Sequence, residues 1–178
     1  MIDPSLVRIA FYEAVGEPRI MLFGPTTTNF RLLQDCFRRL SREELVIDLH
    51  EMPFVYVSGN VWLRLQSIGQ IAWSERQGVF PGLRRLKKDT PAFRCGRTFQ
   101  EWDDLAELID PLVHSDEPGH QYLTRYPDED AIVVVSKSEY DDSVIAEQPG
   151  RLFAPLCFSN LSPHLDGSVV DIEFSTAR

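Results

Sequence analysis

The N-terminal part of the chain combines two short apolar runs with one helical stripe. The runs at 5–14 and 20–23 flank a turn at 15–18 that contains Gly and Pro, a pattern typical of a β-hairpin. From about residue 27 to 41, apolar side chains recur at three- and four-residue steps, which predicts an amphipathic helix with a Thr or Asn cap at 27–29. The stripe consists of Phe30, Leu33, Cys36, Phe37 and Leu40.

Two further strand-like runs follow this helix. One spans 45–57 and is interrupted by Pro53, which is typical of a sheet edge or a bulge. The other spans 61–66, and Ser58-Gly59-Asn60 fits a hairpin turn between the two runs. Residues 5–67 are therefore predicted to form a β-β-α-β-β unit, an open antiparallel or mixed sheet with one helix on a face.

A second helix is predicted to begin after Thr98. The segment Thr98-Phe99-Gln100-Glu101 fits a capping box, in which the first and last side chains each bond the other residue's backbone amide. Pro111 lies inside the apolar stripe and should kink the helix or end its regular hydrogen bonding. The stripe consists of Trp102, Leu105, Ala106, Ile109, Leu112 and Val113.

Strand-like runs dominate the rest of the chain. After the second helix they lie at 121–126, 131–136, 151–158 and 169–174. The second half is thus predicted as α-β-β-β-β, and the whole chain as an α+β fold of mostly antiparallel sheet with two main helices.

The segment between the halves is less regular. It could hold a short strand at 71–74 and a helical turn at 82–88. Two organisations fit this pattern. In the first, residues 1–178 form a single α+β domain. In the second, two coupled lobes at 1–70 and 98–178 are joined by a basic irregular segment at 71–97.

Composition narrows the class of protein. Apolar residues make up 43% of the 178 positions, which is enough to build a packed core. No run approaches a membrane span, and the start of the chain lacks the pattern of a signal peptide, so we expect a cytoplasmic protein without a membrane partner. Cys36, Cys95 and Cys157 form no Cys-x-x-Cys pair, which favours reduced thiols over disulfides.

The net charge of −9 is unevenly distributed. Residues 76–97 carry seven bases and one acid, whereas residues 101–147 carry fourteen acids and two bases. Nucleic acid is not expected as a partner, because the phosphate backbone selects basic surfaces. The basic stretch could neutralise an anionic partner or, more simply, the acidic stretch that follows it.

Two clusters have side chains suited to metal binding or to acid–base chemistry. His114, Asp116 and His120, with Glu117, could hold a divalent ion, although a polar loop after a helix has the same composition. Asp48 and His50 would share one face of a strand, where the acid could orient the imidazole as a general base. A strand with one polar face gives the same pattern, so neither cluster identifies an enzyme.

Cys95 is a candidate reactive thiol. Arg94 and Arg97 flank it and the capped helix begins just after it, and both features lower a thiol pKa. The alternative is a small apolar residue at the end of a strand. The sequence has no Gly-x-Ser-x-Gly, no Walker loop and no Gly-x-Gly-x-x-Gly, and no cofactor is predicted.

The acidic side chains suggest a binding face. Acids in three groups, on the second helix, in a turn before the Val-rich strand and after that strand, could steer a basic partner if they share one side. These residues are Asp103, Asp104, Glu107, Asp110, Asp128, Glu129, Asp130, Glu139, Asp141 and Asp142. The alternative is a solvated surface that keeps the protein in solution.

These observations favour a non-enzymatic acidic protein-binding module over two alternatives. The alternatives are a small hydrolase or metal-dependent enzyme that uses the His and Asp clusters, and a structural subunit of a homo-oligomer. In size, charge and α+β character alone, the chain resembles bacterial immunity and inhibitor proteins, which occupy basic toxin surfaces. That resemblance implies a basic protein as the partner.

Overall fold

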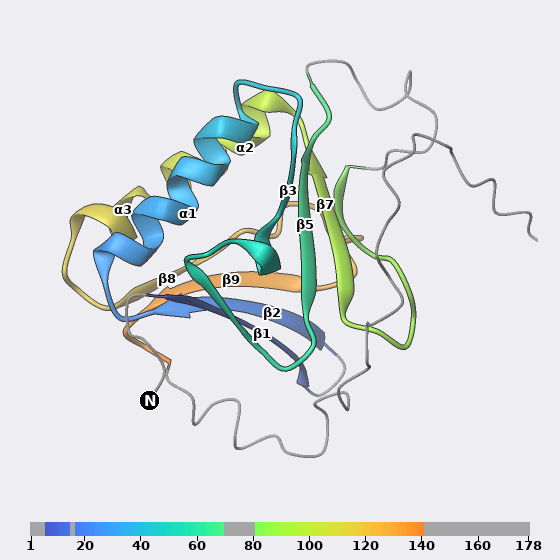
Figure 1. Cartoon of the computed structure of the whole chain (residues 1–178), viewed down its shortest axis with the longest axis horizontal. Coiled ribbons are helices and arrows are strands. Elements are labelled where there is room, and N and C mark those ends of the chain that lie inside the picture. Colours follow the sequence, from blue (N-terminus) through green and yellow to red (C-terminus); the bar gives the residue numbers. More distant parts are fainter. Residues whose placement is uncertain (1–5, 15–16, 70–80, 141–178) are drawn as a thin grey trace, which may run out of the picture.

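A computed structural model describes residues 6–14, 17–69 and 81–140, and it has an α+β fold with two mixed sheets (Figure 1). The five-stranded sheet has the order β4-β1-β2-β9-β8 and the four-stranded sheet the order β3-β5-β7-β6. Three helices are present in the described ranges, and two of them are substantial. The strands are β1 (Val7–Ala14), β2 (Glu17–Gly24), β3 (Val46–Asp48), β4 (Val55–Ser58), β5 (Trp62–Ser67), β6 (Gly82–Arg85), β7 (Ala92–Arg97), β8 (Gly119–Tyr122) and β9 (Ile132–Lys137).

One apolar core joins both sheets to the helices α1 (Thr27–Leu40), α2 (Phe99–Leu108) and α3 (Asp110–His114). The two long helices pack against each other beside the sheets, and the Phe37 and Trp102 rings lie 5.4 Å apart. The predicted apolar stripes supply these contacts, because every member of both stripes is buried. Among the described residues, none of the helices has the length and apolar character needed to cross a membrane.

Several locally encoded elements are confirmed. The β1–β2 hairpin is antiparallel, and α1 begins at Thr27. Its N-cap is Thr26, one residue before the predicted cap at 27–29, and Thr26 forms a capping box with Asn29. The capping box of Thr98 and Glu101 opens α2. Pro111 has the predicted effect, since α2 ends at Leu108 and α3 continues from Asp110 with the proline in its first turn.

The predicted 45–57 strand and the hairpin after it are wrong. β3 ends at Asp48, a 3₁₀ turn η1 (Leu49–Glu51) follows, and β4 begins at Val55. β4 pairs in parallel with β1, whereas β5 belongs to the other sheet. The Ser58-Gly59-Asn60 turn, with Gly59 at φ +84°, therefore connects two sheets. Val55 and Val57 of β4 pack against the core.

The expected helical turn at 82–88 is also wrong, because residues 82–85 form β6. Leu83 is fully buried between Gly82 and the half-buried Arg84, and the strand pairs antiparallel with β7. Gly82 has a φ of +85°, and a side chain there would also meet Glu129, which favours glycine at this position. The predicted strands at 71–74, 151–158 and 169–174 lie outside the described residues, as do Cys157, Asp141 and Asp142.

Candidate functional site

The acidic residues of α2 and α3 flank the apolar stripe that fixes both helices to the core. Asp103 lies beside the end of α1, where the Ser41 hydroxyl is 3.5 Å from its carboxylate. Asp110 accepts a 3.1 Å hydrogen bond from the Gln34 side chain of α1, which lowers the pKa of this carboxyl. Both acids thus border α1, with part of their carboxylates open to solvent.

The other side of α2 faces the loop after β8. Asp104 accepts hydrogen bonds from Gln100 and from Arg125, at 2.8 Å each, and these two bonds lower the pKa of Asp104. Glu107 lies on α2 between the side next to α1 and the side next to the loop after β8, and it is exposed. Its carboxylate has no hydrogen bond or ion pair with any residue in the described ranges.

β8 follows α3 after a short loop, and it is the last strand of the five-stranded sheet in the described part of the chain. The buried Lys137 at the end of β9 donates hydrogen bonds to the carbonyl oxygens of Leu112 and Ser115, which anchors the C-terminal end of α3. Asp116 and Glu117 follow in the exposed loop before β8. We call Asp103, Glu107, Asp116 and Glu117 the acidic flank; no cation pairs with their side chains in the described structure.

Glu139 lies at the far end of this region, just after β9. Its carboxylate is 2.6 Å from Nδ1 of His120 and accepts a hydrogen bond from the Ser136 hydroxyl at 3.3 Å. The Glu139 carboxylate is therefore already paired with His120 and Ser136, and it is not part of the acidic flank.

The turn at 128–130 lies at the opposite end of β9 and pairs with the basic strands. Arg84 donates to the Asp128 carboxylate at 2.6 Å, which lowers the pKa of Asp128. The backbone amide of Arg85 donates to the Asp130 carboxylate at 2.7 Å. Neutralisation of the acidic stretch by the basic one is thus confirmed for Arg84.

Glu129, between these two acids, has a fully buried side chain. Its side chain is 0% exposed and accepts a 2.7 Å hydrogen bond from Arg97, whose side chain is 1% exposed. Burial raises the pKa of Glu129, and the Arg97 charge opposes that change. Glu129 is therefore an interior ion-pair residue, and its carboxylate is not part of a surface.

A second carboxyl group, that of Glu101, lies close enough to Arg97 of this buried ion pair to act on its charge. Glu101 accepts hydrogen bonds from the Tyr126 hydroxyl and from the Thr98 amide and hydroxyl. Burial would raise the pKa of Glu101, but these hydrogen bonds outweigh it and the pKa is lowered. Burial and the same carboxylate raise the pKa of Tyr126 to about 12. The cluster joins the start of α2 to the loop after β8.

The predicted pairing of Asp48 with His50 is wrong. Asp48 binds the guanidinium of Arg64 through two hydrogen bonds, at 2.7 and 3.0 Å. His50 belongs to the 3₁₀ turn that interrupts the expected strand, and its Nδ1 lies 3.4 Å from the Leu63 carbonyl oxygen. The acid is therefore held by an arginine instead of orienting the imidazole.

Stability is expected to fall as the pH drops below the ordinary histidine pKa of about 6.5. Burial lowers the pKa of His50 despite Asp48 and Glu51 nearby, so the unfolded chain takes up a proton that the folded chain excludes. Thermal unfolding at about pH 7.5 and about pH 5.5 would measure this loss, which should be smaller in His50→Gln. An equal loss in both proteins would contradict the assignment to His50.

The histidine cluster near α3 is not assembled into a metal site. His114 pairs with Asp110 at 3.1 Å, whereas His120 pairs with Glu139. Asp116 contacts neither imidazole through any hydrogen bond in the described structure. Within 6–14, 17–69 and 81–140, no three His, Cys, Asp or Glu side chains are grouped to hold a metal ion.

Cys95 has the structural role given as the alternative for it. The thiol is buried in β7, and burial raises its pKa to about 11 even though Arg97 acts in the opposite direction. A thiol in this state is protonated at neutral pH and a poor nucleophile. Its burial therefore favours the structural alternative for Cys95 over a reactive thiol.

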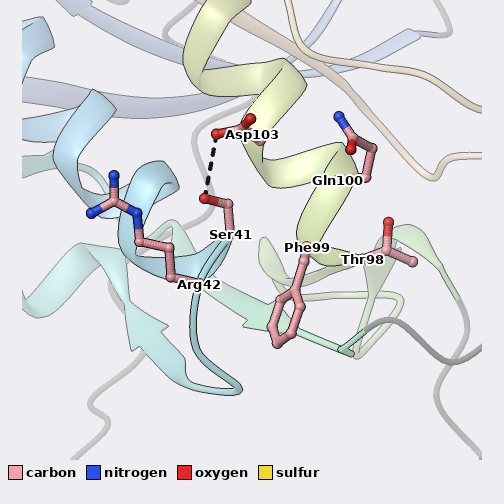
Figure 2. Close-up of a pocket in the computed structure, with 6 residues that line it drawn as sticks. All are labelled: Ser41, Arg42, Thr98, Phe99, Gln100 and Asp103. Carbon is pink, nitrogen blue, oxygen red and sulfur yellow. Dashed lines mark hydrogen bonds between the residues drawn. The ribbon is translucent and has the colours of Figure 1, made fainter.

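A pocket of about 570 Å³ lies where α1 ends and α2 begins (Figure 2). Ser41 and Asp103 face each other across this junction, and Arg42, Thr98, Phe99 and Gln100 complete the lining. The Ser41 hydroxyl donates to the Arg38 carbonyl oxygen, and Thr98 bonds Glu101. The lining thus offers hydroxyl groups, one carboxylate and one guanidinium group, without an imidazole or a thiol.

Sequence reasoning missed a row of arginines on the four-stranded sheet. The register places Arg64, Arg94 and Arg84 side by side on β5, β7 and β6. Arg64 lies between two buried leucines and Arg94 between the buried Phe93 and Cys95, whereas Arg84 follows the buried Leu83. That alternation is visible in the sequence, but which strands are neighbours is not.

No protein-family model matches this chain, and no curated protein or solved structure matches it with significance.

Proposed function

We propose that this protein is a cytoplasmic, non-enzymatic binding module that docks an acidic surface onto a basic protein, as an inhibitor or immunity-type protein does. The observation that carries this proposal is the acidic flank, four carboxylates on α2 and in the loop before β8 that have no cationic partner in the described structure. Unpaired surface charges of one sign steer a partner of the opposite sign and raise its association rate.

The placement of the acidic flank supports this role. Its residues lie on α2 and in the exposed loop that leads to β8, the last strand of the five-stranded sheet in the described ranges. Tyr122 on β8 is 54% exposed, and His120 stacks edge-on against it with ring centroids 5.4 Å apart. Aromatic side chains are frequent anchors at protein interfaces. The register pairs His120 with Ser136 and Tyr122 with Val134, on the face of the sheet that points away from the helices, so these rings form a surface separate from the α2 part of the acidic flank.

Removing three charges of the acidic flank is expected to weaken binding to a basic ligand. The variant combines Glu107→Gln, Asp116→Asn and Glu117→Gln, which are all exposed. Binding of a fluorescein-labelled lysine-rich peptide, measured by anisotropy at about 50 mM salt, should weaken about tenfold. Raising the salt to about 300 mM should weaken the unaltered protein more than the variant, because screening acts on the charges that the variant lacks.

A matched control removes the same number of negative charges from other parts of the surface. Glu17→Gln, Glu51→Gln and Asp89→Asn also remove three exposed carboxylates, on β2, η1 and the β6–β7 turn. This control should bind nearly as well as the unaltered protein. If both triple variants lose affinity equally, net charge alone explains the binding and the acidic flank is not a recognition surface.

A further inference from the structure

The outer face of the four-stranded sheet carries a row of charges that crosses all four strands. Cα pairing aligns Asp48 on β3 with Arg64 on β5, Arg64 with Arg94 on β7, and Arg94 with Arg84 on β6. Residues directly opposite each other on paired strands have side chains on the same face. The buried Leu63, Phe93 and Leu83 occupy the other face, toward the core.

Both ends of this row are neutralised by carboxylates. Asp48 holds Arg64 with two hydrogen bonds, and Asp128 holds Arg84. Each end of the row therefore places a negative charge beside a positive one. In the middle this alternation stops, because Arg64, Arg94 and Arg84 are three positive charges in succession. Arg94 stands between two arginines, and its side chain has no hydrogen bond or ion pair with any residue of the described structure.

The unpaired Arg94 is also partly withdrawn from water. Its Nε is buried without a hydrogen-bond partner, and the residue as a whole is half-buried. Burial lowers the pKa of Arg94, and the neighbouring charge of Arg64 lowers it further. A cation in such a place is destabilised until an anion joins it, since a half-desolvated charge beside a like charge is unfavourable.

The surroundings of Arg94 favour a carboxylate carried by a protein segment. The guanidinium group matches a carboxylate in planar, two-bond geometry, which Asp48 already uses on Arg64. Trp62 and Ala92 lie on one side of the row, beside Arg64 and Arg94, and the 50% exposed Val46 lies on the other side, beside Asp48. These apolar neighbours fit the side chains next to an Asp or Glu in a peptide, which a free small acid lacks.

We propose that Arg94 is the centre of a second binding surface, which takes an acidic protein segment whose Asp or Glu completes the alternating row of charges. One carboxylate suffices, because Arg64 and Arg84 are already paired. A nucleic acid fits less well, since the protein has a net charge of −9 and offers only one unpaired arginine in this row. This surface is separate from the acidic flank and selects the opposite charge.

Peptide binding to the full chain tests this proposal. The probe is a fluorescein-labelled peptide of alternating Glu and Leu, measured by anisotropy at low salt. Arg94→Gln should weaken its binding about tenfold or more, because the charge-assisted pair is lost. The midpoint of thermal unfolding of Arg94→Gln should stay equal to that of the unaltered protein or rise, since an unpaired cation has been removed.

Three controls make the result decisive. Arg39→Gln removes an exposed charge from α1 and should leave peptide binding unchanged. Arg94→Lys keeps the charge without the two-bond geometry, so it should also weaken binding, and it replaces Arg94→Gln if that variant fails to fold. Equal peptide binding by the Arg94 variants and the unaltered protein would overturn the proposal, as would tighter binding of a single-stranded oligonucleotide of the same charge or of free glutamate.

Discussion

Replacing Arg97 with methionine is expected to destabilise the protein by about 3–5 kcal/mol, because Glu129 is then left as a buried charge without its partner. The two side chains are 1% and 0% exposed, and 2.7 Å separates the Arg97 nitrogen from the Glu129 oxygen. The arginine also donates to the Leu123 carbonyl oxygen at 3.1 Å and lies over the Tyr126 ring, so its loss affects the whole loop after β8. Urea unfolding, monitored by circular dichroism, would measure the change.

A double variant separates the role of the pair from the role of packing. Arg97→Met with Glu129→Leu replaces both charges by apolar side chains and should recover most of the lost stability, because no uncompensated charge remains. The two changes are therefore expected to be strongly non-additive. If the double variant is as unstable as the sum of the single variants, the pair contributes through packing alone and the electrostatic explanation fails.

Trp102→Ala is expected to cost about 3–5 kcal/mol, which is typical of a large aromatic side chain removed from a packed core. Trp102 is 1% exposed and joins three elements. Its ring packs on Phe37 of α1, and its Nε1 donates to the Gln66 carbonyl oxygen of β5 at 3.1 Å. Truncation opens a cavity between α1, α2 and the four-stranded sheet, and it leaves that carbonyl without its donor.

Urea unfolding would also measure the effect of Trp102→Ala, with Leu32→Ala as the matched control. Leu32 is on α1 but is exposed, so its truncation should change stability by less than about 0.5 kcal/mol. A loss below about 1.5 kcal/mol for Trp102→Ala would mean that the site collapses around the missing side chain, contrary to the packing described.

The sequence alone was sufficient for the elements whose signals are local. The capping box at Thr98, the effect of Pro111 and the stripes of both long helices each depend on residues within a few turns of one another. The antiparallel β1–β2 hairpin is local for the same reason. The α+β class follows from these elements.

The partners of the strands could not be predicted in this way. β4 and β5 are close in sequence and have similar patterns, yet one joins β1 and the other joins β7. Each choice depends on contacts made far along the chain, which no local window contains. The 3₁₀ turn after Asp48 also arises from tertiary packing, because it buries Leu49 in the core.

The candidate site also depends on contacts between residues that are distant in sequence, so local patterns could not predict it. Asp128, Glu129 and Asp130 are equivalent as a sequence of three acids, but only the middle side chain is directed into the interior against Arg97. One sequence signal was available. Arg97 continues the alternation of the buried Phe93 and Cys95 in β7, and an arginine at an inward position requires a buried acid as its partner.

The pairing of β2 with β9 also affects how the chain acquires its structure. These parallel strands form the middle of the five-stranded sheet, although over a hundred residues separate them in sequence. Contacts between distant segments slow folding, because the entropy of closing a long loop is lost before the strands gain their pairing. At a synthesis rate of ~5–20 residues per second, a time on the order of ten seconds passes between the synthesis of the β1–β2 hairpin and that of β9. Until then the edge of β2 is unpaired, and a nascent chain in that interval is open to pairing with another strand.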